Sequence, residues 1–131
     1  MNPSSVDIVE MIESESDLGL VFESNLFIGK EPAKPSNCVT VFDYDNGMAD
    51  QLTLDKSGLS YPSIQIRVRN TGYLQGWALI EQIKTILHGR ANETWNSAFY
   101  AVIYCSSGPA QLDWDENGRP RFIVNFNISR R

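Results

Sequence analysis

Three aspartates in one polar stretch are the residues most able to do chemistry. Asp43, Asp45 and Asp50 lie close together in the sequence, and clustered carboxylates hold Mg²⁺ at many hydrolytic sites. Such a site also needs a base or a charge-stabilising side chain, and no Lys or His lies beside the cluster to supply one. The sequence therefore favours a solvated loop at this position over a metal site.

A second run of oxygen-bearing residues, DWDENG at 113–118, follows the first half of a calcium-binding loop. Its oxygens alternate and a glycine stands at the sixth position. The twelfth position is Val124 instead of a bidentate glutamate, and the flanking segments alternate like strands. Because Asn-Gly is a strong turn signal, the sequence favours a β-hairpin here.

The single histidine and the two cysteines are the other candidate ligands and nucleophiles. His88 is expected at the end of a helix, where a positive charge suits the helix dipole. A zinc site would combine it with Cys38, Cys105 and a carboxylate, an unusual set at these spacings. The two cysteines could form a disulfide if the fold brings them together, but two buried thiols in a reducing compartment are favoured. The chain also lacks a glycine-rich phosphate cradle and a Gly-x-Ser-x-Gly elbow. The sequence thus predicts no catalytic residue, no metal site and no cofactor.

Composition narrows the class of protein further. The 131 residues are 42% hydrophobic and 21% charged, which predicts one globular domain. The net charge of −5 argues against a surface that grips nucleic acid, because phosphate binding needs clustered Lys and Arg. No apolar run reaches the roughly 20 residues that span a bilayer, and the acidic N-terminus is unlike a signal peptide. We expect a protein that folds in the cytoplasm and has no membrane partner.

The elements that position these residues are clearest from 61 to 87. Apolar and polar residues alternate over 61–69, as in a strand with one buried and one wet face. Over 73–87 the apolar residues recur at helical spacing, and Gly89 suits the left-handed position after a helix. A central strand followed by a helix is therefore the unit around which we arrange the chain.

The remaining segments predict an α+β fold. A first helix begins at the serines before Val6, with a serine as its cap. Strands are expected at 25–29, 38–42, 99–106, 110–114 and 121–129, with a break at Ser107-Gly108-Pro109 and a polar connection over 90–97. The prediction is a single domain over 1–131, with two main helices packed on a mixed, mostly antiparallel sheet.

The stretch at about 43–60 is predicted to be a long flexible loop, or a hairpin whose second arm is 51–54. It is polar, contains two glycines and carries four aspartates: Asp43, Asp45, Asp50 and Asp55. Loops this long inside a compact domain are usually functional or disordered. This loop is therefore the first candidate for a partner contact.

A row of long polar side chains stands out on the strand expected at the centre of the sheet. Gln65, Arg67 and Arg69 share one face of that strand. Two interpretations stay open. The first is solvent exposure or ion pairs with helix carboxylates, and the second is a subunit interface, where Arg makes directional bonds. Three aromatic residues that cannot all belong to the core also favour an interface: Tyr100, Tyr104 and Trp114.

Four passages taken together resemble the phage tail terminator proteins of long-tailed phages, which are also called tail completion or minor capsid proteins. They are DLGLVFESNLFIGKEPAKP (17–35), VFDYDNG (41–47), YPSIQIRVRNTGY (61–73) and LDWDENGRPRFIVNFNI (112–128). The order and spacing of the passages carry the resemblance, which extends from Asp7 to Ile128.

This resemblance implies a homohexameric ring at the head–tail junction of the virion. The ring would cap the tail tube protein, dock to the head–tail connector or stopper protein, and let DNA pass through its lumen. It also implies no enzyme activity and no cofactor. We expect the subunit interface at Gln65, Arg67, Arg69, Tyr100 and Tyr104. We expect the loop that contacts the tail tube or lines the lumen to carry Asp43, Asp45, Asp50 and Asp55. An acidic passage repels phosphate, so DNA would slide through it without specific binding.

Two alternatives stay open beside this interpretation. One is another structural neck protein, such as a head-completion or stopper protein, which would also form a ring but bind the portal side. The other is a small metal-dependent enzyme that uses the carboxylates of 43–50.

Overall fold

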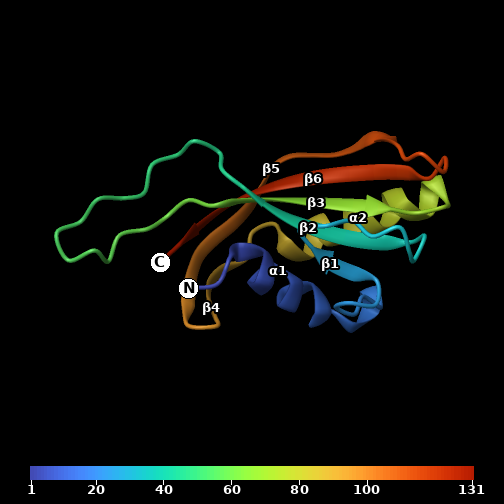
Figure 1. Ribbon diagram of the computed structural model, residues 1–131. Coiled ribbons are helices and arrows are strands. Elements are labelled where there is room, and N and C mark those ends of the chain that lie inside the picture. The colour runs from blue at the N-terminus through green and yellow to red at the C-terminus, as the bar shows by residue number, and fades with distance from the viewer.

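One six-stranded mixed sheet organises the chain in the computed structural model, which describes every residue from Met1 to Arg131 (Figure 1). The strands lie in the order β1-β2-β3-β6-β5-β4. Their bounds are Leu26–Ile28 (β1), Cys38–Tyr44 (β2), Ser63–Arg69 (β3), Ala91–Trp95 (β4), Ala98–Trp114 (β5) and Pro120–Arg130 (β6). Neighbouring strands are antiparallel except for the parallel pair of β1 and β2. The predicted α+β fold with a mixed, mostly antiparallel sheet is confirmed.

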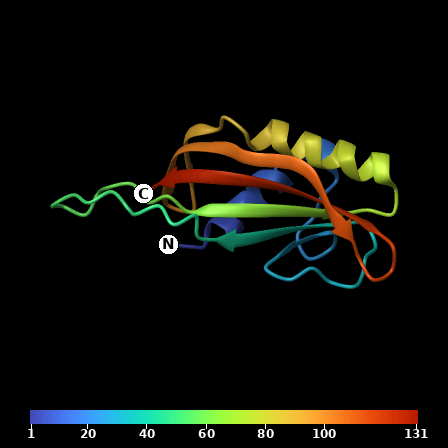
Figure 2. The same ribbon diagram turned by 90° about the horizontal axis from the view of Figure 1, so that it is seen from above.

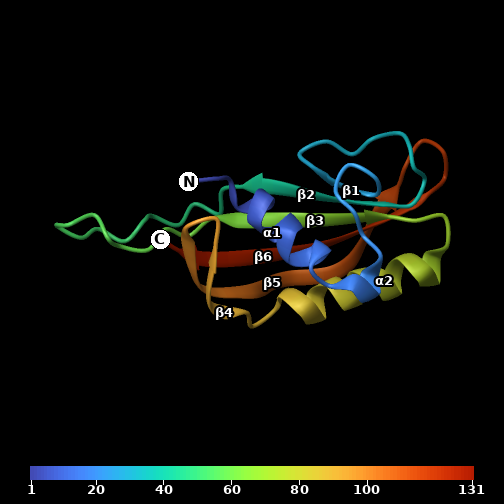
Figure 3. The ribbon, with the colours of Figure 1, turned by 90° about the horizontal axis from the view of Figure 1, so that it is seen from below.

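Both main helices cover the same face of the sheet (Figures 2 and 3). Helix α1, Ser4–Glu13, lies over β1 and β2, and helix α2, Tyr73–Leu87, lies over β3, β5 and β6. The sequence explains the packing of α2, because Ile80, Ile83 and Leu87 recur at helical spacing and are fully buried. Neither helix is long and apolar enough to cross a membrane. One face of the sheet is therefore packed, and the other face carries no helix.

Alternate residues of the central strands make the packed face. Their fully buried side chains each contribute about 1.5–3 kcal/mol by leaving water. They are Ile64, Ile66 and Val68 in β3 and Phe122, Val124 and Phe126 in β6. Helix α2 approaches this layer closely at Gly76, where an added Cβ atom would lie 2.6 Å from Cε2 of Phe122. Glycine is needed there because a side chain would push the helix away from the sheet.

Three boundaries differ from the sequence prediction. Strand β5 runs through the Ser107-Gly108-Pro109 segment with register shifts, instead of breaking there. Residues 91–95, expected in a connection, form the edge strand β4, and β2 continues to Tyr44. A short 3-10 turn at Ser16–Leu18 follows α1. Pairing across the sheet decides the strand boundaries, because hydrogen bonds to a neighbour hold residues whose own preference for a strand is weak.

Residues 45–62 form a long arm between β2 and β3, which we call the arm. In all three views it projects beyond the ends of the strands (Figures 1 to 3). The N–H of Gln51 donates to the carbonyl oxygen of Leu59 at 2.7 Å, which holds the two limbs together near the tip. The predicted loop is present, but it starts at Asp45 because Asp43 belongs to β2, and its 51–54 segment is not a strand.

Candidate functional site

The sheet face without helices carries polar and aromatic side chains at alternate strand positions. We call this surface the uncovered face and define it by Phe42, Tyr44, Gln65, Arg67, Tyr104, Asn125 and Asn127. A row of hydrogen bonds crosses it. Arg67 Nη2 donates to Gln65 Oε1 at 3.1 Å, and Gln65 Nε2 donates to Asn125 Oδ1 at 3.2 Å. These bonds fix the side chains as a flat polar layer over the strands.

Arg67 lines a shallow hollow on the uncovered face. The hollow has a volume of about 380 Å³ and is lined by Phe42, Tyr44, Gln65, Arg67 and Asn125. The guanidinium carbon of Arg67 lies 4.9 Å from the centre of the Phe42 ring, a cation–π contact. Its Nε atom is buried and has no hydrogen-bond partner. The sequence prediction missed Phe42, Tyr44 and Asn125, because strand alternation gives their face but not which strands are neighbours.

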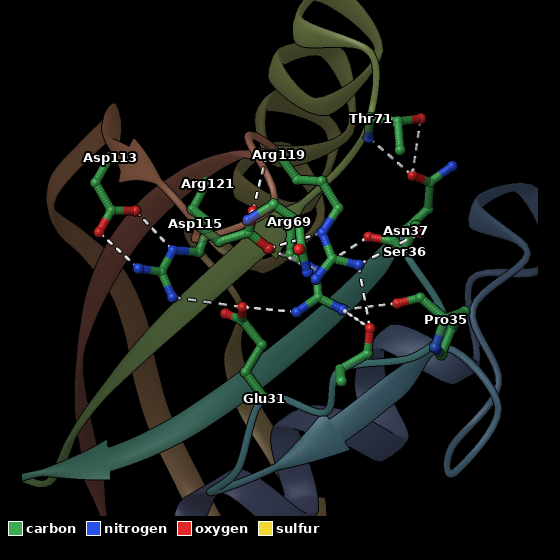
Figure 4. A network of polar contacts seen from close by, with 12 residues as sticks. Glu31, Pro35, Ser36, Asn37, Arg69, Thr71, Asp113, Asp115, Arg119 and Arg121 are labelled. Atoms are coloured by element: carbon green, nitrogen blue, oxygen red, sulfur yellow. Dashed lines mark hydrogen bonds and ion pairs between the residues drawn. The ribbon is translucent and has the colours of Figure 1, made fainter.

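Arg69, two residues further along β3, is buried instead. Only 3% of its side chain is exposed, because the loop between β1 and β2 covers it (Figure 4). Its Nη1 donates to Glu31 Oε1 at 3.0 Å, and its Nη2 donates to the carbonyl oxygen of Pro35 at 2.7 Å. Its Nε donates to the carbonyl oxygen of Ser36 at 3.1 Å. The expectation of an exposed Arg69 beside Arg67 is wrong, because this chain already satisfies its guanidinium.

Two more arginines fix the hairpin between β5 and β6 beside this network (Figure 4). Arg121 donates to both carboxylate oxygens of Asp113 at 2.6 Å, and Arg119 Nε donates to Asp115 Oδ2 at 2.7 Å. The hydrogen bonds from Arg121 hold the pKa of the Asp113 carboxyl below its usual range. The predicted hairpin is confirmed. The carboxylates that resembled calcium ligands serve as partners of arginines.

The two tyrosines predicted at an interface lie on opposite faces of the sheet. Tyr104 is on the uncovered face, where 40% of its surface is exposed. Tyr100 is fully buried under α1, and its hydroxyl donates to the carboxylate of Asp7 and accepts from Nη1 of Arg130 at 3.1 Å. Burial raises the pKa of Tyr100 well above its usual range. The expectation of Tyr100 at a surface contact is wrong, because the register of β5 turns it inward to satisfy a buried carboxylate.

Asp43 has a structural partner that its sequence position did not reveal. Its Oδ1 accepts the backbone N–H of Ser5 at 3.0 Å, and its Oδ2 accepts the Ser5 hydroxyl proton. The first turn of a helix has unpaired N–H groups and a partial positive charge. Asp43 thus caps α1 from the neighbouring strand, where the sequence predicted a serine cap. Asp43 therefore does not belong to the predicted contact loop.

The arm turns its polar side chains inward and its leucines outward. Gln51 Oε1 accepts the N–H of Leu59 at 3.0 Å, and Thr53 Oγ1 accepts the N–H of Gly58 at 3.1 Å. Leu52 and Leu54 alternate with these residues and are 97% and 106% exposed. Large side chains exposed to this degree mark an interaction surface when they gather on one element.

The structure does not bring the carboxylates of 43–50 together. Asp43 faces α1, Asp45 Oδ1 accepts the N–H of Gly47 at 2.8 Å, and no hydrogen bond or ion pair involves Asp50. No group of three or more His, Cys, Asp or Glu side chains is placed to hold a metal ion. The carboxylates of this segment are therefore separate from one another, with Asp43 on β2 and Asp45 and Asp50 on the exposed arm.

His88 and the two cysteines also lie apart from any such cluster. His88 follows α2, and its Nδ1 accepts the N–H of Cys105 at 2.9 Å. Both cysteines are free thiols. Burial raises the pKa of the Cys38 thiol, which keeps the thiol protonated and unreactive.

The fold is shared with a chain of a solved virion. A solved chain described as "Virion of native gene transfer agent (GTA) particle" superposes with a TM-score of 0.67 over 96% of this chain and 92% of that chain, at 10% sequence identity. At this identity the likeness shows a shared fold. The chain belongs to the bacteriophage tail terminator protein family, whose sequence profile matches residues 5–131. It is therefore a structural component of a phage tail. No curated protein sequence matches the chain significantly.

Proposed function

We propose that the protein forms a homohexameric ring that caps the tail tube, ends tail elongation and joins the tail to the head connector. The observation that carries this proposal is the match of the tail terminator family over residues 5–131. The shared fold with a chain of a gene transfer agent virion supports it. We assign the protein a structural role without enzyme activity or cofactor, in the virion at the head–tail junction, after assembly in the host cytoplasm.

The uncovered face supplies the subunit contact of the proposed ring. It presents Gln65, Arg67 and Tyr104 on a surface that no helix covers. Arginine and tyrosine are enriched at protein interfaces because they combine a large contact area with directional hydrogen bonds. We exclude Arg69 and Tyr100 from the proposed subunit contact, because both side chains are buried within the chain.

The arm supplies the acidic surface of the proposed ring. Asp45, Asp50 and Asp55 are all exposed on it. A ring of six such arms would place negative charge at the lumen or at the rim that meets the tail tube. Because like charges repel, phosphate groups of the DNA would not bind there, and DNA could pass without being held.

The test is the molar mass in solution by light scattering, measured alone and after mixing with purified tail tubes. We expect either six times the 14.8 kDa subunit mass or a smaller species that binds tube ends and stops their growth. A monomer that leaves tube elongation unchanged would refute the proposal. Sedimentation with tail tubes rather than with filled heads separates a terminator from a stopper or head-completion protein.

A further inference from the structure

We propose that in the ring the arm of one subunit lies on the uncovered face of its neighbour. Asp50 of the arm pairs with Arg67 of the neighbour, which leaves Asp45 and Asp55 to supply the acidic surface of the arm. Leu52 and Leu54 pack against the phenyl ring of Phe42 and its surroundings. This inference rests on the proposed ring and names the element that fills its subunit contact. The partner is a second copy of this chain.

The receiving site has an arginine without a carboxylate partner. Five of the seven arginines form ion pairs within the chain, and Arg67 does not. Its Nε atom is buried and unpaired, and its guanidinium lies over Phe42 in the hollow of about 380 Å³. An unpaired buried donor is costly, because it has lost water without gaining another partner. A carboxylate that enters the hollow would remove that cost.

The arm carries a matching set of side chains. Gln51 and Thr53 face the opposite limb of the arm, where they accept hydrogen bonds. Asp50 and Leu52 flank Gln51 and are exposed, and Leu54 is exposed in the turn that the N–H of Lys56 closes on the carbonyl oxygen of Thr53. Asp45 and Asp55 already accept hydrogen bonds from nearby residues of the arm, and Asp50 accepts none. Asp50 is therefore the carboxylate of the arm that is free to bind an arginine.

The leucines of the arm do not pack into the hollow of their own subunit, because Leu52 and Leu54 are almost fully exposed. The arm begins beside Tyr44, which lines the hollow, and projects beyond the ends of the strands (Figure 1). A contact between an arm and a hollow on different copies can repeat from head to tail, and such heterologous contacts generate rings when the rotation closes. A two-fold dimer that exchanges arms would make the same contacts, and its molar mass of two subunits instead of six distinguishes it from the ring.

A second exposed apolar cluster is a less favourable docking site for the arm. It is formed by Tyr73, Leu74, Leu112 and Trp114 at the start of α2 and the end of β5. The arginines beside it, Arg119 and Arg121, are already paired with Asp115 and Asp113. The cluster therefore offers the leucines a surface but leaves Asp50 without a cation, and charge complementarity favours Arg67.

A charge exchange in the full-length chain tests the contact. We expect Arg67→Glu and Asp50→Arg each to raise the protein concentration needed for half-maximal capping of tail tubes at least about tenfold. The double variant should bring this concentration back to within about threefold of the native value. Arg131→Glu is the matched control, because Arg131 also lies 4.9 Å from a phenylalanine ring, that of Phe99, and forms no ion pair. Full capping by Arg67→Glu, or a double variant no better than the single ones, would overturn the inference.

Photo-crosslinking identifies the surface that receives the arm. With benzoylphenylalanine in place of Leu54, we expect crosslinked dimers whose joined peptides include Phe42 or Arg67. Crosslinks to 73–84, to 112–114 or to the tail tube protein would overturn the inference while the ring and its capping activity remain. If the native protein neither forms a ring nor caps tubes, the proposed function fails as well, so the two failures are distinct.

Discussion

Replacing Arg69 should destabilise the fold, while replacing its neighbour Arg67 should not. The two arginines lie on the same face of β3, two residues apart, and sequence reasoning could not separate them. Arg69 is buried in a network of protein acceptors, and Arg67 has one side-chain hydrogen bond, to Gln65. Comparing Arg69→Ala with Arg67→Ala therefore distinguishes an arginine that stabilises the fold from an arginine that is proposed to contact a neighbouring subunit.

The structure sets the size of each effect. Removing Arg69 leaves Glu31 and the carbonyl groups of Pro35 and Ser36 without their donor. Breaking a buried ion pair on one side costs about 3–5 kcal/mol, and the 3.5 Å contact of Arg121 with Glu31 moderates the loss. We expect about 3 kcal/mol, or a fall in Tm of about 10 °C for a domain of this size. Removing Arg67 loses one hydrogen bond and one cation–π contact, and we expect less than about 1 kcal/mol.

Urea unfolding followed by tryptophan fluorescence measures both values, and tail-tube capping measures function. We expect Arg69→Ala to unfold at a clearly lower urea concentration. Arg69→Lys should lose about half as much free energy of unfolding, because lysine keeps the charge but not the planar set of donors. Arg67→Ala should retain stability and lose capping. Equal losses of stability in the two alanine variants would refute the reasoning from burial.

Three further changes test the helix cap, the hairpin and the packing of α2. Asp43→Ala should cost about 1 kcal/mol in the free energy of unfolding by urea, because the first turn of α1 loses its acceptor. Because Arg121 lowers the folded-state pKa of Asp113, that carboxylate stabilises the fold above its unfolded pKa of about 3.9 and loses this effect as the pH falls through its folded pKa. The stability gap between Asp113→Asn and the native protein should therefore shrink in acid, and a gap that is constant with pH would contradict this. Gly76→Ala should lower the Tm by the equivalent of about 1–3 kcal/mol, because its Cβ would lie 2.6 Å from the Phe122 ring, and an unchanged Tm would contradict the close approach of the helix.

Local patterns in the sequence determine the central unit of the fold. The alternation over 61–69 predicts β3, and the helical spacing over 73–87 predicts α2 with the same bounds that the structure shows. Asn-Gly at 117–118 predicts the hairpin between β5 and β6. These features are local, because side-chain periodicity and turn chemistry depend on residues a few positions apart. The family resemblance was also readable, because it rests on the order of passages along the chain.

Only the tertiary structure shows which polar side chains lack a partner within the chain. Arg67 and Arg69 have the same residue type and strand face, yet Arg67 is half-buried and Arg69 is buried, because a loop from another part of the chain covers only Arg69. Asp43 caps a helix 38 positions away in sequence, and Tyr100 satisfies Asp7 from 93 positions away. Partners at such separations depend on strand order and register, which periodicity does not encode. The sequence alone therefore could not show that the arm is exposed or that Arg67 lacks a carboxylate partner within the chain.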